Sequence, residues 1–325
     1  MVTLAETQFT TQELRGLIAA RLGESQVPHR FKVVRDTTEF FHIDYNDVVV
    51  LDHTPYLMRN YEREGRFGLE DEPKYWVRRA VDLATGETKV VKLVFDEAFE
   101  AKVGGVAFHC VRSPHKEAAV LDLTRGHASF MQGFSARDAA GNTVRVIDFI
   151  PGARLDAYVS KRCRDHESYY HAELPALLAV YGELVAAIGL LHRHGYKHGD
   201  IRRDHILLDP PAATWRWIDF DFDYVAEANP FGYDLFGLGN ILIFLAGGGD
   251  VTTQILARTE APALQRLTTD DLNIVFNHRV ANLQKVYPYI ADSLAHVLRH
   301  FSQGADVFYE DTGQLLADLA EVRLA

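Results

Sequence analysis

Hydrophobic and polar residues alternate along the first part of the chain in a way that predicts β-strands. Runs rich in β-branched and aromatic residues occupy positions 47–51, 56–59, 74–82 and 89–95, with turn-forming residues between them at 53–55 and 84–87. Consecutive short strands joined by tight turns favour antiparallel pairing. A further apolar run at 144–150, closed by Pro151 and Gly152, predicts one more buried strand. Residues 40–95 are therefore expected to form an antiparallel sheet.

A helical spacing of apolar residues marks the N-terminus. Thr10 and Glu13 have the spacing of a capping box, and apolar residues follow at positions 14, 17, 18 and 22. This pattern predicts an amphipathic helix that packs on the main body. Residues 1–39 are then either a plain helical extension or a partner-binding or regulatory element.

The second half of the chain is predicted to be mainly helical. A long apolar helix at 174–194 is stopped by Gly195, and shorter helices are expected at 294–301 and 315–319. Ser113 and Pro114 begin a separate helix that runs to residue 123. An antiparallel sheet followed by helices belongs to the α+β class. The 325 residues, 47% of them hydrophobic, suffice for one large domain or one bilobal unit.

Composition and charge narrow the classes of partner. The chain holds 34 Lys and Arg against 45 Asp and Glu, a net charge of −11, and has no basic tract. This argues against nucleic acid and against an anionic membrane surface as partners. Two cysteines without a CxxC motif fit a reducing compartment, and the longest apolar run, at 241–246, is too short to span a bilayer. We therefore expect a soluble cytoplasmic protein.

The chemistry-bearing residues gather in one stretch, residues 190–224. Two short β-prone runs, at 206–208 and 215–220, flank a turn at Asp209-Pro210-Pro211 and predict a hairpin. This hairpin would bring Asp200, before its first strand, near Asp219, at the end of its second. One carboxylate on a loop and another at a strand end suit a base that orients a hydroxyl and a ligand for a hard cation.

The same stretch resembles the catalytic loop and metal-binding segment of the protein kinase superfamily. Residues 198–205, HGDIRRDH, match the family motif HRDLKxxN, and residues 219–221, DFD, match DFG. The HGD variant is similar to that of aminoglycoside phosphotransferases and small atypical kinases. The resemblance implies that Asp200 accepts or orients a substrate hydroxyl, Arg202 neutralises the transferring phosphate, and Asp219 holds magnesium.

His205 departs from the family pattern, which has a metal-binding asparagine at this position. Imidazole is a poor ligand for magnesium and a reasonable one for manganese. His205 therefore implies a changed metal preference, a single-metal enzyme or a weakened one. Asp204 and Asp221 are spare carboxylates that either compensate in the metal site or are solvated loop charges. Histidines 194, 198 and 205 also permit a structural zinc site, but the kinase pattern accounts for this loop better.

Upstream residues extend the resemblance to the kinase N-lobe. Residues 80–95, AVDLATGETKVVKLVF, resemble the second and third N-lobe strands, so Lys92 corresponds to the lysine that contacts the α and β phosphates. Gly65, Phe67 and Gly68 resemble the end of a glycine-rich phosphate loop whose first glycine is replaced by Arg63. A simple β-turn is the alternative for these residues.

Glu117 is the candidate for the helix glutamate that pairs with Lys92, the alternative being a surface acid favoured by the helix dipole. The gap between them is long, which predicts an inserted turn or hairpin at 96–111. Residues 146–155, VIDFIPGARL, resemble the linker between kinase lobes. By that resemblance, backbone groups of Asp148 and Ile150 bind the adenine edge and Ile147 lines the pocket.

Residues 233–239, YDLFGLG, resemble the start of the family's central helix, where Asp234 would anchor the catalytic loop. From Asp219 to Asp234 is 234 − 219 = 15 residues. So short a segment argues against control by phosphorylation of an activation loop.

The resemblance as a whole implies a bilobal protein-kinase-like fold, with a helical extension at 1–39, an N-lobe at 40–150 and a C-lobe at 151–325. It implies a phosphotransferase that uses ATP and Mg²⁺ or Mn²⁺, first of all a Ser/Thr protein kinase of atypical bacterial type. The acceptor would be an unidentified protein or small-molecule hydroxyl. Two alternatives stay open, a small-molecule kinase of the aminoglycoside or choline type and a nucleotide-binding pseudokinase.

Overall fold

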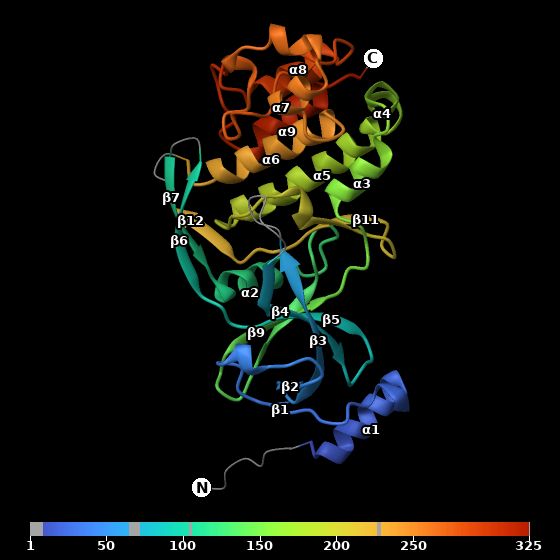
Figure 1. Cartoon of the computed structure of the whole chain (residues 1–325). Helices are drawn as coiled ribbons and strands as arrows, with labels where there is room; N and C mark the ends of the chain where they lie inside the picture. The colour runs from blue at the N-terminus through green and yellow to red at the C-terminus, as the bar shows by residue number, and fades with distance from the viewer. Residues whose placement is uncertain (1–8, 65–71, 104–105, 226–228, 325) are drawn as a thin grey trace. The chain divides into compact units, whose positions relative to one another are not determined.

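The computed structural model describes residues 9–64, 72–103, 106–225 and 229–324. The chain divides into two compact units (Figure 1). Unit 1 comprises Met1–Asp96, Ser113–Gly126 and Met131–Phe149, and unit 2 comprises Glu97–Arg112, His127–Phe130 and Ile150–Ala325.

Unit 1 is built on a seven-stranded sheet of order β1-β2-β3-β4-β5-β9-β8. The strands are β1 (Val33–Val34), β2 (Val48–Leu51), β3 (Thr54–Glu64), β4 (Glu72–Asp82), β5 (Thr88–Lys92), β8 (Gly133–Arg137) and β9 (Thr143–Asp148). All neighbours pair antiparallel except β1 and β2, which are parallel. The expected antiparallel sheet is confirmed, and β1 adds a parallel edge that the sequence did not predict.

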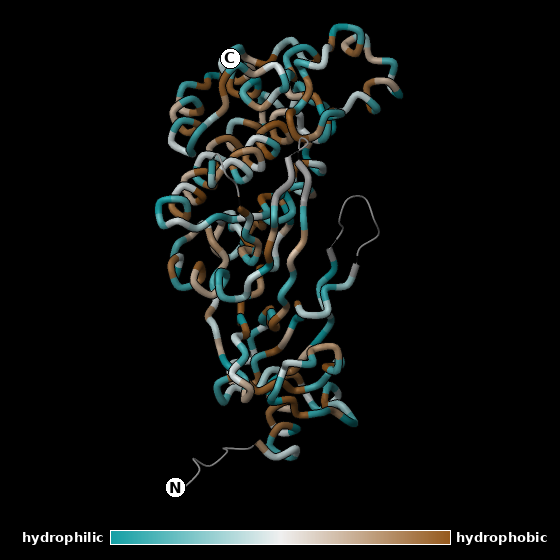
Figure 2. The backbone as a smooth tube through the Cα atoms, turned by 90° about the vertical axis from the view of Figure 1, so that its left-hand side faces the viewer, coloured by the Kyte–Doolittle hydropathy of each residue, from teal (hydrophilic) through white to brown (hydrophobic). Residues whose placement is uncertain are grey.

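The sheet of unit 1 is buried on both faces at β2, where all four residues are buried. Val49 and Leu51 belong to one apolar cluster, and Val48 and Val50 belong to another that includes residues of helix α1 (Thr11–Leu22). Side chains alternate between the faces of a strand, so a strand covered on both faces is apolar throughout. Figure 2 shows the hydrophobic stretches where α1 meets the first strands.

Helix α1 begins as its sequence predicts. The Thr10 side chain accepts a hydrogen bond from the Glu13 N–H at 3.2 Å, and the Glu13 carboxylate accepts one from the Thr10 N–H at 2.7 Å. This reciprocal capping box satisfies two backbone donors at the helix start. Leu14 and Ile18 then bury their side chains completely. The predicted amphipathic helix is confirmed as a packed part of unit 1.

Helix α2 (Pro114–Leu123) directly precedes β8 in the chain and packs against β8 and β9. The Ser113 side chain accepts a hydrogen bond from the Lys116 N–H at 3.3 Å, and Pro114 occupies the first turn. Both features were expected from the sequence.

Unit 2 contains most of the described helices, the hairpin between Asp200 and Asp219, and a small sheet. Its helices are α3 (Leu155–Arg162), α4 (His166–Ala172), α5 (Leu174–Arg193), α6 (Gly232–Ala246), α7 (Thr253–Arg258), α8 (Asp292–Arg299) and α9 (Thr312–Glu321). Strands β10 (Ile206–Asp209) and β11 (Thr214–Trp217) form the predicted antiparallel hairpin. Short 3₁₀ turns lie at Glu24–Gln26 and Phe40–His42 in unit 1, and at Arg203–His205, Pro262–Arg266, Thr269–Asp271 and Leu283–Lys285 in unit 2.

Helix α5 is the central helix of unit 2. The Tyr181 hydroxyl donates to the Leu238 carbonyl at 2.9 Å, and the Trp217 indole donates to the Leu184 carbonyl at 3.0 Å. The helix is long and apolar enough to cross a membrane by length and composition, and half of its apolar stretch is buried inside the protein. The long apolar helix predicted at 174–194 is therefore confirmed.

The insertion expected at 96–111 is a hairpin of β6 (Glu97–Val103) and β7 (Val106–Arg112). Strand β7 also pairs antiparallel with β12 (Phe222–Val225), which follows the DFD residues directly. The result is a three-stranded sheet of order β12-β7-β6. The sequence predicted the hairpin but not its pairing with β12.

Candidate active site

The loop after α5 is anchored by one buried carboxylate. Asp234, in the first turn of α6, is fully buried and accepts hydrogen bonds from the His198 N–H at 2.7 Å and the Gly199 N–H at 2.9 Å. The His192 Nε2 lies 3.0 Å from the same carboxylate. The contact expected between Asp234 and the catalytic-loop backbone is therefore present.

The charge of Asp234 is stabilised despite its burial. Burial alone would raise its pKa, but hydrogen bonding to His192, electrostatic interaction with His192 and His198, and the Gly199 N–H together outweigh burial, so the pKa lies below its usual value. The carboxylate is thus held ionised in the protein interior. An ionised carboxylate accepts stronger hydrogen bonds from backbone N–H groups than a neutral acceptor does.

Gly199 explains why this loop has HGD rather than HRD. Its φ is +89°, and a Cβ built there would lie 2.0 Å from the carbonyl oxygen of Phe222 in β12. A side chain at this position would therefore collide with the backbone of β12. The glycine allows the loop that carries Asp200 to lie directly against the strand that follows Asp219.

His205 lies between the two candidate catalytic carboxylates. Its Nδ1 is 3.7 Å from an Asp200 carboxylate oxygen, and its Nε2 is 3.5 Å from an Asp219 carboxylate oxygen. The hairpin holds it there, because Ile206 pairs with Trp217 and the Ile218 N–H donates to the His205 carbonyl at 3.0 Å. The structure thus brings Asp200 and Asp219 to opposite sides of one imidazole ring.

The hydrogen bonds of His205 define which ring nitrogen carries the proton. Nδ1 lies 2.9 Å from the backbone carbonyl oxygen of Asp200, which can only accept, so Nδ1 is the protonated nitrogen. In the neutral ring, the lone pair of Nε2 then points toward Asp219. A backbone carbonyl that fixes the tautomer in this way is typical of histidines that ligate metals. Asp219 and His205 therefore form a two-donor set that suits a divalent cation.

Asp219 has an unusual backbone. Its φ of +68° lies in the left-handed region, which costs free energy for a residue other than glycine. The neighbouring Phe220 is completely buried and packs against His198, with ring centroids 4.7 Å apart, and against Phe130 at 5.6 Å. These contacts hold the strained segment in place and fix the direction of the Asp219 side chain.

Arg202 is engaged by Asp204. Its Nε lies 3.0 Å from Oδ1 and its Nη2 2.5 Å from Oδ2 of that carboxylate, while its Nη1 is 3.9 Å from Asp200. Burial would raise the pKa of Asp204, but electrostatic interaction with His205 and the pairing with Arg202 lower it overall. Asp204 therefore serves as the counter-ion of Arg202 in this structure.

Asp221 is also engaged by an arginine. Its carboxylate is completely buried and lies 2.7 Å from the Nη1 of Arg112 on β7, whose side chain is 1% exposed. The Arg112 guanidinium also stacks on the Phe222 ring at 4.1 Å. This ion pair ties the DFD segment to the inserted hairpin. The carboxylate of Asp221, which the sequence suggested as a metal ligand, is thus paired with Arg112 in this structure.

Unit 1 holds a buried cluster of charges on β5, β9 and α2. Lys92 donates to one Glu117 oxygen at 2.7 Å, and Arg145 donates to the other at 3.1 Å. The three side chains are between 0% and 4% exposed. The expected ion pair between Lys92 and Glu117 is present. Sequence reasoning missed Arg145, because it stands opposite Lys92 only through the register of two strands distant in sequence.

The remaining predicted nucleotide contacts are only partly described. Ile147 is 5% exposed, and the Asp148 N–H donates to the Gln132 carbonyl at 2.8 Å while its carboxylate pairs with Lys89 at 2.8 Å. Ile150 begins the last segment of unit 2. The predicted phosphate-loop residues Gly65, Phe67 and Gly68 lie outside the described residues.

Comparisons with known proteins support the fold through structure rather than sequence. No protein-family model matches the chain, and no curated protein sequence matches it. Similar solved structures include the kinase domain of Mycobacterium tuberculosis PknI. A single-substitution variant has a TM-score of 0.51 at 13% identity, and a double-substitution variant 0.50 at 14%; both similarities cover 86% of this chain and 98% of that chain. At this identity the similarity shows the fold alone, and the chain has an α+β, bilobal protein kinase-like fold.

Proposed function

We propose that this protein is an ATP-dependent phosphotransferase that transfers the γ-phosphoryl group to a hydroxyl, most specifically a Ser/Thr protein kinase. The observation that carries the proposal is the arrangement around His205, where one ring contacts both Asp200 and Asp219 while buried Asp234 fixes the backbone of the same loop. Catalysis of this type depends mostly on positioning and charge neutralisation.

Asp200 is assigned the role of base that orients the acceptor hydroxyl. Its side chain is 19% exposed, so a substrate can reach it. Arg202, 3.9 Å from the Asp200 carboxylate, is assigned to neutralise charge on the transferring phosphoryl group. Arg202 would have to shift from Asp204 toward the phosphate, a change that the bidentate pairing with Asp204 opposes until substrate arrives.

Asp219 and the Nε2 of His205 are assigned to the metal. A nitrogen donor beside a carboxylate favours Mn²⁺ over Mg²⁺, which prefers oxygen ligands. The bound cation would neutralise phosphate charge. Asp221 is left out of this set, because its completely buried carboxylate is already paired with Arg112 at 2.7 Å, and binding a metal would have to break that buried ion pair.

Lys92 is assigned to the α and β phosphates, oriented by Glu117. The assignment of the nucleotide to Gly65, Phe67, Gly68, Ile147 and the backbone of Asp148 and Ile150 rests on the sequence resemblance. The proposal keeps a helical extension at 1–39, an N-lobe at 40–150 and a C-lobe at 151–325, and it places the protein in the cytoplasm. Glu117 acts by positioning Lys92, without touching the transferred group.

A small-molecule acceptor is the second candidate, and one observation favours it. Strand β12, directly after the DFD residues, is already paired with β7, and α6 begins at Gly232. Segments that cradle a peptide substrate are normally longer and unpaired, so this one favours a compact acceptor. Label found on protein supports the first candidate, and label found on a metabolite supports the second.

Transfer from γ-labelled ATP by wild type and by Asp200→Asn tests the proposed chemistry. We expect the substitution to lower the transfer rate about 10²- to 10⁴-fold, the usual contribution of a general base, while ATP affinity stays within about twofold. Asp122→Asn, which alters an exposed carboxylate paired with Arg125, is the matched control. Equal transfer by wild type and Asp200→Asn would show that Asp200 is not the base.

A further inference from the structure

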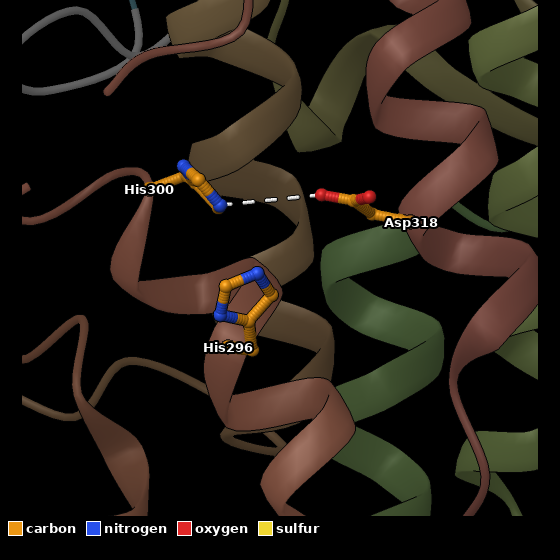
Figure 3. A group of neighbouring side chains, drawn as sticks. All are labelled: His296, His300 and Asp318. Carbon is orange, nitrogen blue, oxygen red and sulfur yellow. Dashed lines mark ion pairs between the residues drawn. The ribbon is translucent and has the colours of Figure 1, made fainter. Parts of the chain in front are cut away.

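A second group of metal-ligating side chains lies among the last helices of unit 2, in residues that the proposed reaction does not use. His296 is on α8, His300 follows the end of α8, and Asp318 is on α9 (Figure 3). One ligand atom from each lies within 4.8 Å of the other two. We propose that these three residues bind a divalent transition-metal ion, zinc first of all, and that the ion clamps α9 to α8.

The spacing of the two histidines follows from the helix. Residues four apart lie on one face of a helix, so His296 and His300 project to the same side, with ring centroids 5.0 Å apart. Beneath them Leu294, Val297 and Leu298 are buried, which fixes the face that α8 presents. Asp318 comes three residues after buried Leu315 on α9.

Hydrogen bonds orient two of the three proposed ligands, His300 and Asp318. The Nδ1 of His300 lies 2.8 Å from the Val307 carbonyl, so Nδ1 carries the proton and the Nε2 lone pair is left for a metal. That Nε2 faces Asp318, whose Oδ2 is 4.0 Å away. The Tyr309 hydroxyl donates to the same Oδ2 at 2.7 Å and holds the carboxylate in position. Outer partners of this kind are typical of metal sites.

The donor types select the metal. Two imidazoles and one carboxylate suit zinc and its neighbours in the transition series rather than magnesium or calcium, which prefer oxygen donors. Tetrahedral zinc with bonds of about 2.0 to 2.1 Å places its ligand atoms about 3.3 Å apart. The present separations of up to 4.8 Å are larger. Rotation of the exposed His296 side chain and a tilt of the His300 ring would close the difference, and water would complete the coordination.

Equilibrium dialysis of the full chain against zinc alone, without nucleotide, tests the proposal. We expect His296→Ala to weaken binding of one zinc ion at least tenfold, and Tyr309→Phe to weaken it about tenfold by releasing Asp318. His29→Ala, an exposed histidine of unit 1, should leave zinc binding unchanged. Because His205 and Asp219 are intact in all three variants, any zinc that they bind is a common background.

Thermal unfolding gives the second readout. Removing zinc with a chelator should lower the Tm of wild type by more than that of His296→Ala, which keeps only the background of the other zinc-binding residues. Because His296 is exposed, this variant is expected to fold, and His300→Ala should reproduce its loss of zinc. Equal zinc stoichiometry and affinity in wild type, His296→Ala and His300→Ala would overturn the proposal and leave His300 and Asp318 as neighbours that share no metal.

Discussion

Replacement of Asp234 by alanine is the most demanding test of how the catalytic loop is held. The substitution removes the acceptor of two buried backbone N–H groups, those of His198 and Gly199, and the partner of His192. A hydrogen bond to a charged group contributes about 1.5 to 3 kcal/mol, so losing both backbone contacts should cost roughly 3 to 6 kcal/mol. That is a large fraction of a typical stability of about 5 to 15 kcal/mol.

Denaturant unfolding followed by circular dichroism measures this loss, and a Tm lower by roughly 10 °C should accompany it. Asp234→Asn keeps one oxygen acceptor and should lose only about half as much stability. Asp122→Ala, which breaks an exposed ion pair, should cost less than about 1 kcal/mol. If Asp234→Ala unfolded within about 1 kcal/mol of wild type, the loop would be held by other contacts and the anchoring role would be wrong.

Three further outcomes follow from the charges of the two units. Glu117→Ala leaves Lys92 and Arg145 buried without their carboxylate, so we expect a loss of about 3 to 5 kcal/mol in denaturant unfolding; stability equal to that of wild type would contradict the buried cluster. His205→Asn should shift nucleotide-binding preference from manganese toward magnesium in calorimetry, and an unchanged metal ratio would exclude His205 as a ligand. The pKa of Asp234 is lower in the folded than in the unfolded chain, so its contribution to stability is complete above its ordinary value of 3.8 and is lost as pH falls below that value; Asp234→Asn should therefore show a shallower acid transition in a pH titration of unfolding.

Local sequence signals predicted most of the elements that position the site. Capping residues marked the starts of α1 and α2, and the hairpin of β10 and β11 followed from its turn residues. That hairpin was enough to predict that Asp200 and Asp219 lie close together. These features depend on residues near one another in the chain, where spacing alone carries the information.

The missed features depend on contacts between residues far apart in sequence. Arg112 and Asp221 are 109 residues apart, and their ion pair forms only because β7 pairs with β12. Arg145 meets Glu117 through the register of β5 and β9. Periodicity indicates that such strands exist but not which strands become neighbours. The sequence therefore suggested Asp221 as a metal ligand, whereas in the structure the pairing of β7 with β12 places Arg112 beside its carboxylate.

Binding of ATP to the purified full chain, with magnesium, with manganese and without metal, tests the central claim most directly. We expect metal-dependent binding in wild type, at least tenfold weaker binding in Asp219→Asn, and no change in Asp223→Asn, whose carboxylate is half exposed beside Lys197. Labelled γ-phosphate should then appear on an acceptor only in the metal-containing samples. ATP binding that is equal with and without metal, and equal in wild type and Asp219→Asn, would contradict the account and leave only the similarity of fold.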